Sequence, residues 1–243
     1  TDGGTGHVEI LLRLHDEAGR IILPDSFIPA AERYGLMTSL DRWVVENVFK
    51  IIANCMRERP GRPMAMCAIN LSGNTIGDDD FLIFLRQQFV TYAVPPEMIC
   101  FEITETSAIS NLASAIKFIN ELKDLGCHFS LDDFCAGMSS FAYLKHLPVD
   151  FLKIDGSFVR DMLDDPINRA MVEVINHIGH VMGKRTIAEF VETPQIEQAL
   201  LEIGVDYAQG YIIQRPQLFT CDSLQTRPAR SRPLLFKAPG TFR

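Results

Sequence analysis

The chain has 243 residues, which fits one large domain or two small ones, and a single (β/α)8 barrel takes about 250. Apolar residues make up 47% and charged residues 22%, ordinary values for a globular protein, and the formal net charge of −8 argues against a nucleic-acid polymer as partner. We find no signal peptide and no apolar run of the roughly 18 residues that a membrane span needs. The sequence therefore predicts a cytoplasmic domain, whether or not its parent protein is anchored in a membrane.

Short β-rich runs alternate with longer helical patterns along nearly the whole chain. The expected strands cover residues 7–14, 64–72, 98–104, 128–133, 151–155, 185–191 and 207–213. The expected helices cover residues 39–56, 80–92, 111–125, 166–183 and 194–203. Ser39 and Thr193 are start signals, and Gly126 and Gly204 are stop signals. Repeated strand–helix units favour a closed α/β barrel over its alternative, a doubly wound open sheet.

We expect one domain over residues 1–225 and a poorly ordered tail over residues 226–243, where Arg, Pro and Ser are interleaved. The Gly-rich start, residues 1–6, leads directly into a strand, so it is either a linker or the place where a first strand is missing. The six cysteines form no CxxC pair and show no regular spacing, which favours buried thiols in a reducing compartment over a disulfide framework.

Polar residues interrupt nearly every expected strand, near its middle or its carboxyl end. They are Glu9, Arg13, Asn70, Glu102, Asp132, Asp133, Lys153, Asp155, Glu189, Glu192 and Gln209. A single acid at a strand end is usually a cap or an ion-pair partner. Many carboxylates at one barrel mouth would repel one another unless cations neutralised them. Hard oxygen ligands without a His or Cys cluster indicate Mg²⁺ or Mn²⁺ rather than zinc.

These residues lie in an ordered series of short motifs that resembles the EAL domain family. The series is Glu9-Ile10-Leu11 with Arg13, Phe27-Ile28-Pro29, Asn70-Leu71-Ser72, Glu102-Ile103-Thr104-Glu105, Asp132-Asp133-Phe134, Ser139-Ser140, Lys153-Ile154-Asp155, Ala188-Glu189 with Val191-Glu192, and Gln209-Gly210-Tyr211. The resemblance runs from about Glu9 to Pro216. It implies a TIM-like (β/α)8 barrel of the EAL type, with its first strand missing or truncated, that hydrolyses cyclic di-GMP to the linear dinucleotide pGpG.

The resemblance also implies roles for single residues. Two Mg²⁺ or Mn²⁺ ions would be held by Glu9, Asn70, Glu102, Asp132, Asp133 and Glu189. Lys153 would orient the attacking water and Asp155 would fix the lysine. Arg13 would meet a substrate phosphate, and Leu11, Gln209 and Glu192 would complete the pocket. Glu105 would anchor the loop after Asp133, and Ca²⁺ would inhibit because its coordination is longer and looser.

Three departures from the family pattern have physical consequences. Cys135 stands where the family usually has glycine, which would restrict the loop if that position needs a positive φ. Phe190 replaces a common glycine beside Glu189, and we expect it on the opposite face of the strand. Ile10 replaces the alanine of the name motif and is expected to be harmless.

The resemblance further implies a homodimer formed through the loop 132–140 and, in the full protein, upstream GGDEF or sensory domains. Two other functions stay open at this point. One is a cyclic di-GMP receptor with little or no activity, and only Cys135 and the missing strand favour it. The other is an unrelated magnesium barrel enzyme such as an enolate-forming lyase, which the Lys153-x-Asp155 strand fits loosely.

Overall fold

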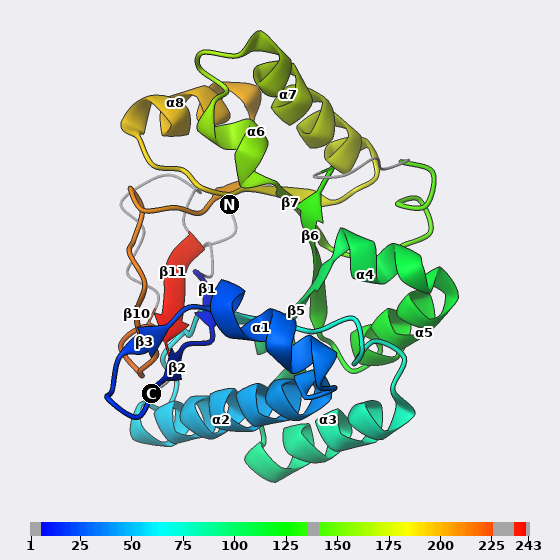
Figure 1. Cartoon of the computed structure of the whole chain (residues 1–243), viewed down its shortest axis with the longest axis vertical. Coiled ribbons are helices and arrows are strands. Elements are labelled where there is room, and N and C mark those ends of the chain that lie inside the picture. The colour runs from blue at the N-terminus through cyan, green and yellow to red at the C-terminus, as the bar shows by residue number, and fades with distance from the viewer. Residues whose placement is uncertain (1–5, 136–140, 226–235, 242–243) are drawn as a thin grey trace.

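The computed structural model describes residues 6–135, 141–225 and 236–241. Its nine-stranded parallel sheet has the order β10-β11-β1-β4-β5-β6-β7-β8-β9. The strands are β1 (His7–Leu11), β4 (Met66–Asn70), β5 (Ile99–Thr104), β6 (His128–Phe134), β7 (Phe151–Ile154), β8 (Arg185–Ala188), β9 (Tyr207–Ala208), β10 (Gln217–Leu218) and β11 (Phe236–Thr241). A separate antiparallel pair joins β2 (Leu14–His15) to β3 (Ile21–Ile22). From β1 to β9 the strands follow chain order and curve around a centre, which confirms the barrel and rules out the doubly wound sheet (Figure 1).

Helices cover the outside of this ring of strands (Figure 1). They are α1 (Pro24–Arg33), α2 (Met37–Glu58), α3 (Asp79–Tyr92), α4 (Glu105–Ser110), α5 (Leu112–Lys123), α6 (Gly156–Arg160), α7 (Pro166–Val181) and α8 (Pro194–Ile203), with the 3-10 turn η1 (Pro96–Met98). All five expected helices are present. Thr193 caps α8 and Gly204 ends it at φ +84°, as expected, whereas α2 begins at Met37, ahead of Ser39. None of the helices in the described part of the chain is both long and apolar enough to cross a membrane.

The strands bury side chains on both faces, as the period of two requires. Outward-facing residues such as Ile69, Phe101 and Phe129 pack with the helices in the main apolar core. Inward-facing residues form a second, smaller cluster inside the barrel, made of Met66, Ala68, Cys100, Phe151 and Ile187. The inner cluster closes the barrel below the carboxyl ends of the strands.

Part of the stretch 226–243, which we expect to be poorly ordered, is described as a strand. Residues 236–241 form β11, which pairs in parallel with β1 on one side and with β10 on the other. It therefore takes the place next to β1 where the first strand of the family barrel was expected to be missing. An uncovered edge of β1 would leave a row of backbone N–H and C=O groups unpaired, and β11 pairs them. The rest of the predicted tail, 226–235 and 242–243, lies outside the described residues.

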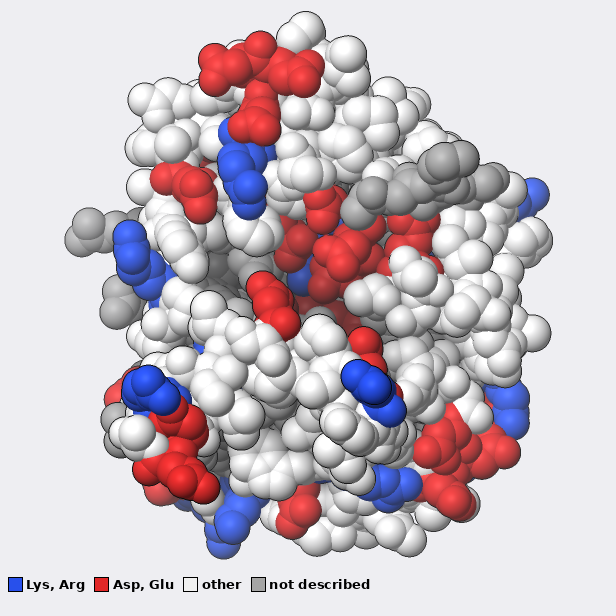
Figure 2. Space-filling view, viewed as in Figure 1, with Lys and Arg blue, Asp and Glu red and all other residues white. Residues whose placement is uncertain are grey.

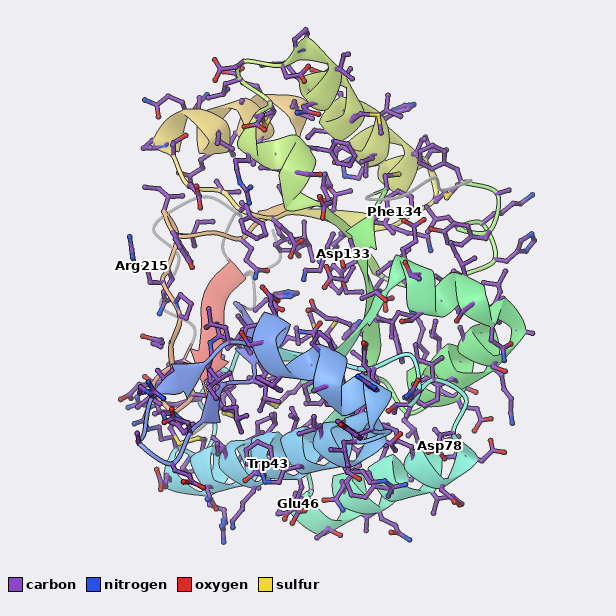
Figure 3. All side chains as sticks on the ribbon, in the orientation of Figure 1. Trp43, Glu46, Asp78, Asp133, Phe134 and Arg215 are labelled. Atoms are coloured by element: carbon purple, nitrogen blue, oxygen red, sulfur yellow. A yellow bond between two sulfur atoms is a disulfide. The ribbon has the colours of Figure 1, made fainter. Side chains whose placement is uncertain are left out.

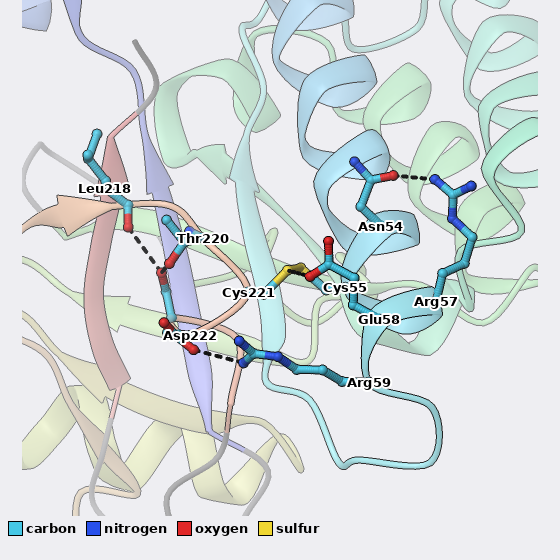
Figure 4. The surroundings of a disulfide bond; sticks show 10 residues. Asn54, Cys55, Arg57, Glu58, Arg59, Leu218, Thr220, Cys221 and Asp222 are labelled. Atoms are coloured by element: carbon cyan, nitrogen blue, oxygen red, sulfur yellow. Dashed lines mark hydrogen bonds and ion pairs between the residues drawn. A yellow bond between two sulfur atoms is a disulfide. The ribbon is translucent and has the colours of Figure 1, made fainter.

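The expectation of six free thiols is wrong for two of them. Cys55, near the end of α2, and Cys221, after β10, form a disulfide across 166 residues of sequence (Figure 4). An ion pair beside it, from Arg59 Nη1 to Asp222 Oδ1 at 2.8 Å, joins the same two segments. Cys67, Cys100, Cys127 and Cys135 are free. The two segments meet because β10, just before Cys221, lies in the same sheet as β1 and β4, which flank α2 in the chain. The spacing of the cysteines does not reveal this.

We expect loss of this disulfide to lower stability without touching the barrel mouth. A native disulfide contributes about 2–4 kcal/mol, because it limits the freedom of the unfolded chain. For a domain of this size that corresponds to a fall in Tm of roughly 5–15 °C. Calorimetry of the oxidised protein with and without dithiothreitol checks this, and Cys221→Ser is the control, because its Tm should be low and insensitive to the reductant. An equal Tm for all three samples would contradict the prediction.

Candidate active site

A buried lysine lies at the centre of four carboxylates at the mouth of the barrel. Lys153, on β7, is 1% exposed. Its Nζ lies 2.8 Å from Glu189 Oε1, 3.0 Å from Asp132 Oδ1, 3.3 Å from Glu102 Oε2 and 3.6 Å from Glu9 Oε2. The five side chains come from β1, β5, β6, β7 and the end of β8. Figure 2 shows acidic side chains gathered in the hollow at the middle of this face of the molecule.

The period of two explains why these polar side chains meet. Each of four site residues follows an inner-cluster residue by two positions and therefore shares its face of the sheet. The pairs are Ala68 and Asn70, Cys100 and Glu102, Phe151 and Lys153, and Ile187 and Glu189. Asn70 is directly opposite Glu102 in the sheet, and Thr104 is opposite Asp132. The barrel interior thus changes from apolar to acidic within one layer, at the carboxyl end where barrel enzymes place their chemistry.

Three neutral or backbone donors hold the acids in place. Asn70 Nδ2 donates to Glu9 Oε1 at 2.9 Å, and Gln209 Nε2 donates to Glu9 Oε2 at 2.5 Å. The backbone N–H of Asp133 donates to Asp132 Oδ1 at 3.0 Å. Gln209 reaches Glu9 because Gly210, the next residue, lets the chain approach Val191, whose backbone O lies 2.1 Å from where a Cβ would stand. These contacts place the side chains of Asn70 and Gln209 beside Glu9 in the acidic cluster.

Burial sets the electrostatics of the cluster. Burial raises the pKa of Glu102 well above its usual range, although Lys153 opposes the shift. Burial likewise raises the pKa of Glu189 to about 8, against Lys153 and with the help of Asp132. Burial would also raise the pKa of Glu9, but Lys153 and the hydrogen bonds from Gln209 and Asn70 outweigh it and lower that pKa. One lysine therefore does not neutralise the acids around it.

The donor set of this cluster fits divalent cations. Asp132, Asp133 and Glu189 each offer an oxygen, and these three atoms lie within 4.8 Å of one another. Asp133, labelled in Figure 3, lies at the end of β6 and takes a φ of +53°; burial and then Asp132 raise its pKa to about 6. Glu102 Oε1 is buried with no hydrogen-bond partner in the part of the chain that the structure describes. Hard oxygen atoms, an excess of negative charge and an unsatisfied buried carboxylate oxygen are what Mg²⁺ or Mn²⁺ would complete.

Other residues singled out from the sequence lie at the rim. Leu11 ends β1 and is half-buried, and Arg13, beyond the strand, donates to the backbone O of Leu12 at 2.8 Å. Glu192 is exposed after β8. Asp155, expected to fix the lysine, instead caps α6 by accepting from Ser157 N at 2.8 Å, and the four carboxylates that pair with Lys153 do not include it. The strand ends at Ile154, and the carboxyl group of Asp155 also interacts with that of Asp133, so Asp155 borders the acidic cluster without pairing with the lysine. Its expected role beside Lys153 stays a prediction.

Phe190 also differs from expectation. β8 ends at Ala188, so Phe190 lies beyond the strand, at φ +53°, and not on its opposite face. Its ring is 49% exposed beside Glu189, under the guanidinium of Arg160 at 4.8 Å. Tyr211, after Gln209, is similarly exposed with Arg215 5.1 Å from its ring. Two exposed aromatic rings that stack with arginines therefore follow Glu189 and Gln209 closely in the chain. The backbone of Phe190 is left-handed, a conformation that is uncommon for a bulky residue.

Glu105, the first residue of α4, holds the start of the loop that follows β6. Its Oε2 accepts from the backbone N–H of Cys135 at 2.9 Å, and its Oε1 accepts from the hydroxyl of Tyr143. Cys135 has a φ of +66°, so the position does need the conformation that favours glycine. Tyr143 was not predicted, because no local motif connects it with Glu105. The remainder of the expected dimer loop, residues 136–140, lies outside the described residues.

Comparison with known proteins decides the family. The family model described as EAL domain matches residues 1–216. The chain belongs to the EAL domain family. This EAL domain is 40% identical over 225 residues to cyclic di-GMP phosphodiesterase PdeB of Shewanella oneidensis, covering 92% of this chain and 26% of that protein. It is 37% identical to cyclic di-GMP phosphodiesterase PdeF of Escherichia coli, covering 88% of this chain and 28% of that protein.

Solved structures agree with this assignment. The EAL domain of FimX from Pseudomonas aeruginosa bound to cyclic di-GMP superimposes with a TM-score of 0.79 at 33% identity, covering 86% of this chain and 82% of that chain. The MucR phosphodiesterase in complex with cyclic di-GMP also gives 0.79, at 28% identity, covering 85% and 83%. This EAL domain spans about a quarter to a third of the length of the curated relatives.

Proposed function

We propose that this EAL domain hydrolyses one phosphodiester bond of cyclic di-GMP and releases the linear dinucleotide pGpG, with two Mg²⁺ or Mn²⁺ ions as cofactors. The arrangement of Lys153 among Glu9, Glu102, Asp132 and Glu189 carries the proposal, because every one of these groups is present and all converge on one barrel mouth. The named activity of PdeB and PdeF, and the cyclic di-GMP bound to related EAL structures, support the substrate.

Glu9, Asn70, Glu102 and Asp132 would hold one ion, and Asp132, Asp133 and Glu189 the second. When bound, the pair supplies Lewis-acid activation of water and stabilises negative charge on the attacking and leaving oxygens. The oxygen atoms of Asp132, Asp133 and Glu189 are close enough together to share a cation, and the unpartnered Glu102 Oε1 offers a further ligand atom.

Lys153 would orient the attacking water and add positive charge beside the scissile phosphate. Burial lowers the pKa of an amine, but Asp132, Glu102 and the other acids around Lys153 raise it well above its usual range, so the lysine stays protonated. It therefore acts as a hydrogen-bond donor and not as a base. Arg13 would bind a phosphate at the rim, and Leu11, Glu192 and Gln209 would line the substrate pocket beside the exposed rings of Phe190 and Tyr211.

A second candidate is a cyclic di-GMP receptor with little activity. Cys135 and Phe190 favour it, because both occupy left-handed backbone positions where a glycine would be unstrained. We also propose, from the resemblance alone, a homodimer through the loop 132–140 and cytoplasmic GGDEF or sensory domains upstream. The bifunctional diguanylate cyclase/cyclic di-GMP phosphodiesterase MucR is one relative that carries a second activity. Binding of cyclic di-GMP without release of pGpG would decide for the receptor.

Hydrolysis should require a divalent cation, because the acids at the mouth outnumber the positive charge of Lys153. We expect Mg²⁺ or Mn²⁺ to support release of pGpG and exhaustive chelation to abolish it. Ca²⁺ should inhibit, since its longer and looser coordination would misplace the groups held by the ions. Chromatography of the products with each metal measures this, with Glu9→Gln as an inactive control. Full turnover after chelation would contradict the two-metal proposal.

A further inference from the structure

We propose that Asp41, a buried residue of α2 outside the acidic cluster, is a positioning residue for the ligand Asn70. This inference rests on the proposed metal-dependent function. Asp41 is 5% exposed, and its Oδ2 accepts three hydrogen bonds from the turn that follows β4. They come from Ser72 N at 3.0 Å, Ser72 Oγ at 2.7 Å and Thr75 Oγ1 at 2.6 Å. One carboxylate thus fixes the chain two residues beyond Asn70.

The turn from Ser72 to Thr75 is held together by its own hydrogen bonds, so fixing it at Asp41 also fixes the residues beside it. Thr75 N donates to Ser72 O at 3.1 Å, and the two hydroxyl oxygens lie 3.0 Å apart. Thr75 is fully buried. Between the turn and Asn70 lies only Leu71, which is buried and whose N–H donates to Glu102 O at 2.9 Å. A displacement of the turn would therefore move Asn70, together with its hydrogen bond to Glu9 and its place opposite Glu102.

The other side of the contact is rigid. α2 buries Val45, Val48, Phe49 and Ile52 completely, so the helix is held by the main apolar core. Asp41 has no lysine or arginine partner among the ion pairs of the described residues. Its carboxylate is stabilised by the turn instead. A buried carboxylate without a cation is expensive, and a residue that only filled space here would be better apolar. What the carboxylate contributes is the fixed position of the turn.

The experiment is isothermal titration of the metal-free protein with Mn²⁺, alongside hydrolysis of cyclic di-GMP. Loss of a residue that orients a metal ligand typically costs 10- to 100-fold in affinity, so Asp41→Ala should raise the Kd for Mn²⁺ about tenfold. Asp41→Asn retains one acceptor oxygen and should recover part of the loss. Thr75→Val removes one of the three hydrogen bonds to Asp41 by changing the donor instead of the acceptor. This variant should fold, and its Kd for Mn²⁺ should rise less than that of Asp41→Ala.

Two comparisons separate positioning from general stability. In the Asn70→Ala background, Asp41→Ala should add little to the Kd, because the residue through which it acts is already gone. Asp150→Ala is the matched control: Asp150 accepts from Phe129 N at 2.9 Å and from Lys123 at the other end of the barrel, so its loss should lower Tm but leave the Kd unchanged. Additive effects of Asp41→Ala and Asn70→Ala, or an unchanged Kd in Asp41→Ala and Thr75→Val, would overturn the inference while the wild type still binds Mn²⁺. Absence of Mn²⁺ binding by the wild type would instead overturn the proposed function and this inference with it.

Discussion

Lys153→Met should lower turnover of cyclic di-GMP about 100- to 1000-fold, the usual cost of removing one donor that stabilises developing charge. Methionine fills similar space, so the barrel should keep its packing. The same change should destabilise the metal-free protein by about 3–5 kcal/mol, because it leaves four buried or half-buried carboxylates without their cation. Added Mg²⁺ should restore much of that stability, since it would neutralise the same acids.

The measurement is Tm with and without Mg²⁺, together with turnover under saturating metal. Lys184→Met is a matched control, because Lys184 is also buried but donates to the backbone O of Leu147 and Val149 at 2.8 and 3.0 Å, away from the acids. Its Tm should fall equally with and without Mg²⁺, and turnover of the folded protein should stay near that of the wild type. Wild-type turnover in Lys153→Met would show that the lysine is a structural ion-pair partner only.

The fold was predictable because its signals are local. Short β-rich segments alternate with amphipathic helices, and all seven expected strands and five expected helices are present. Some strands were predicted to extend too far, because the alternation of polar and apolar residues continues beyond the last paired residue. The strand expected over residues 185–191 ends at Ala188, and for this reason the predicted place of Phe190 on the strand is wrong. The strand expected over residues 207–213 covers only Tyr207–Ala208. Periodicity shows that a strand exists but not where its hydrogen bonds stop.

The convergence of the acidic cluster was predictable for the same reason. In a parallel barrel, residues at the carboxyl ends of the strands must meet, and their order in the chain gives their order around the mouth. The contacts that fix them were not predictable. Tyr143 meets Glu105 from 38 residues away, and Thr75 meets Asp41 from 34 residues away. Hydroxyl groups at loop positions have no sequence pattern that identifies such a partner.

The disulfide and β11 were missed because both depend on the last part of the chain returning to the sheet beside β1. Cys55 and Cys221 are far apart in the sequence and meet only because the segment that follows β10 lies against the C-terminal end of α2. Residues 236–241 pair with β1 from the opposite end of the chain. The interleaved Arg, Pro and Ser of the tail predict poor order from composition, and composition gives no sign that residues 236–241 pair with the edge of β1.

Glu105→Ala should lower turnover about 100-fold and weaken metal binding, while the barrel stays folded. The change removes the acceptor of both the Cys135 N–H and the Tyr143 hydroxyl, so the backbone directly after Asp132 and Asp133 loses its anchor. A misplacement of catalytic groups by about 1 Å costs about that factor in rate. Leaving two donors unpaired should also cost about 1–3 kcal/mol each in stability where they stay buried.

A graded series tests whether the anchor acts through the metal ligands. Tyr143→Phe removes one of the two hydrogen bonds and should lower turnover less than Glu105→Ala does. Cys135→Gly keeps both bonds and relieves a left-handed residue, a strain of about 1–2 kcal/mol that the added freedom of the unfolded chain partly offsets. Its turnover should therefore equal or exceed that of the wild type. Turnover, Mn²⁺ affinity, Tm and dimer fraction are measured for all three variants. If Glu105→Ala matches the wild type in turnover and Mn²⁺ affinity, the loop is only a connector. If turnover in all three merely follows the folded fraction, Glu105 serves stability and not the position of Asp132 and Asp133.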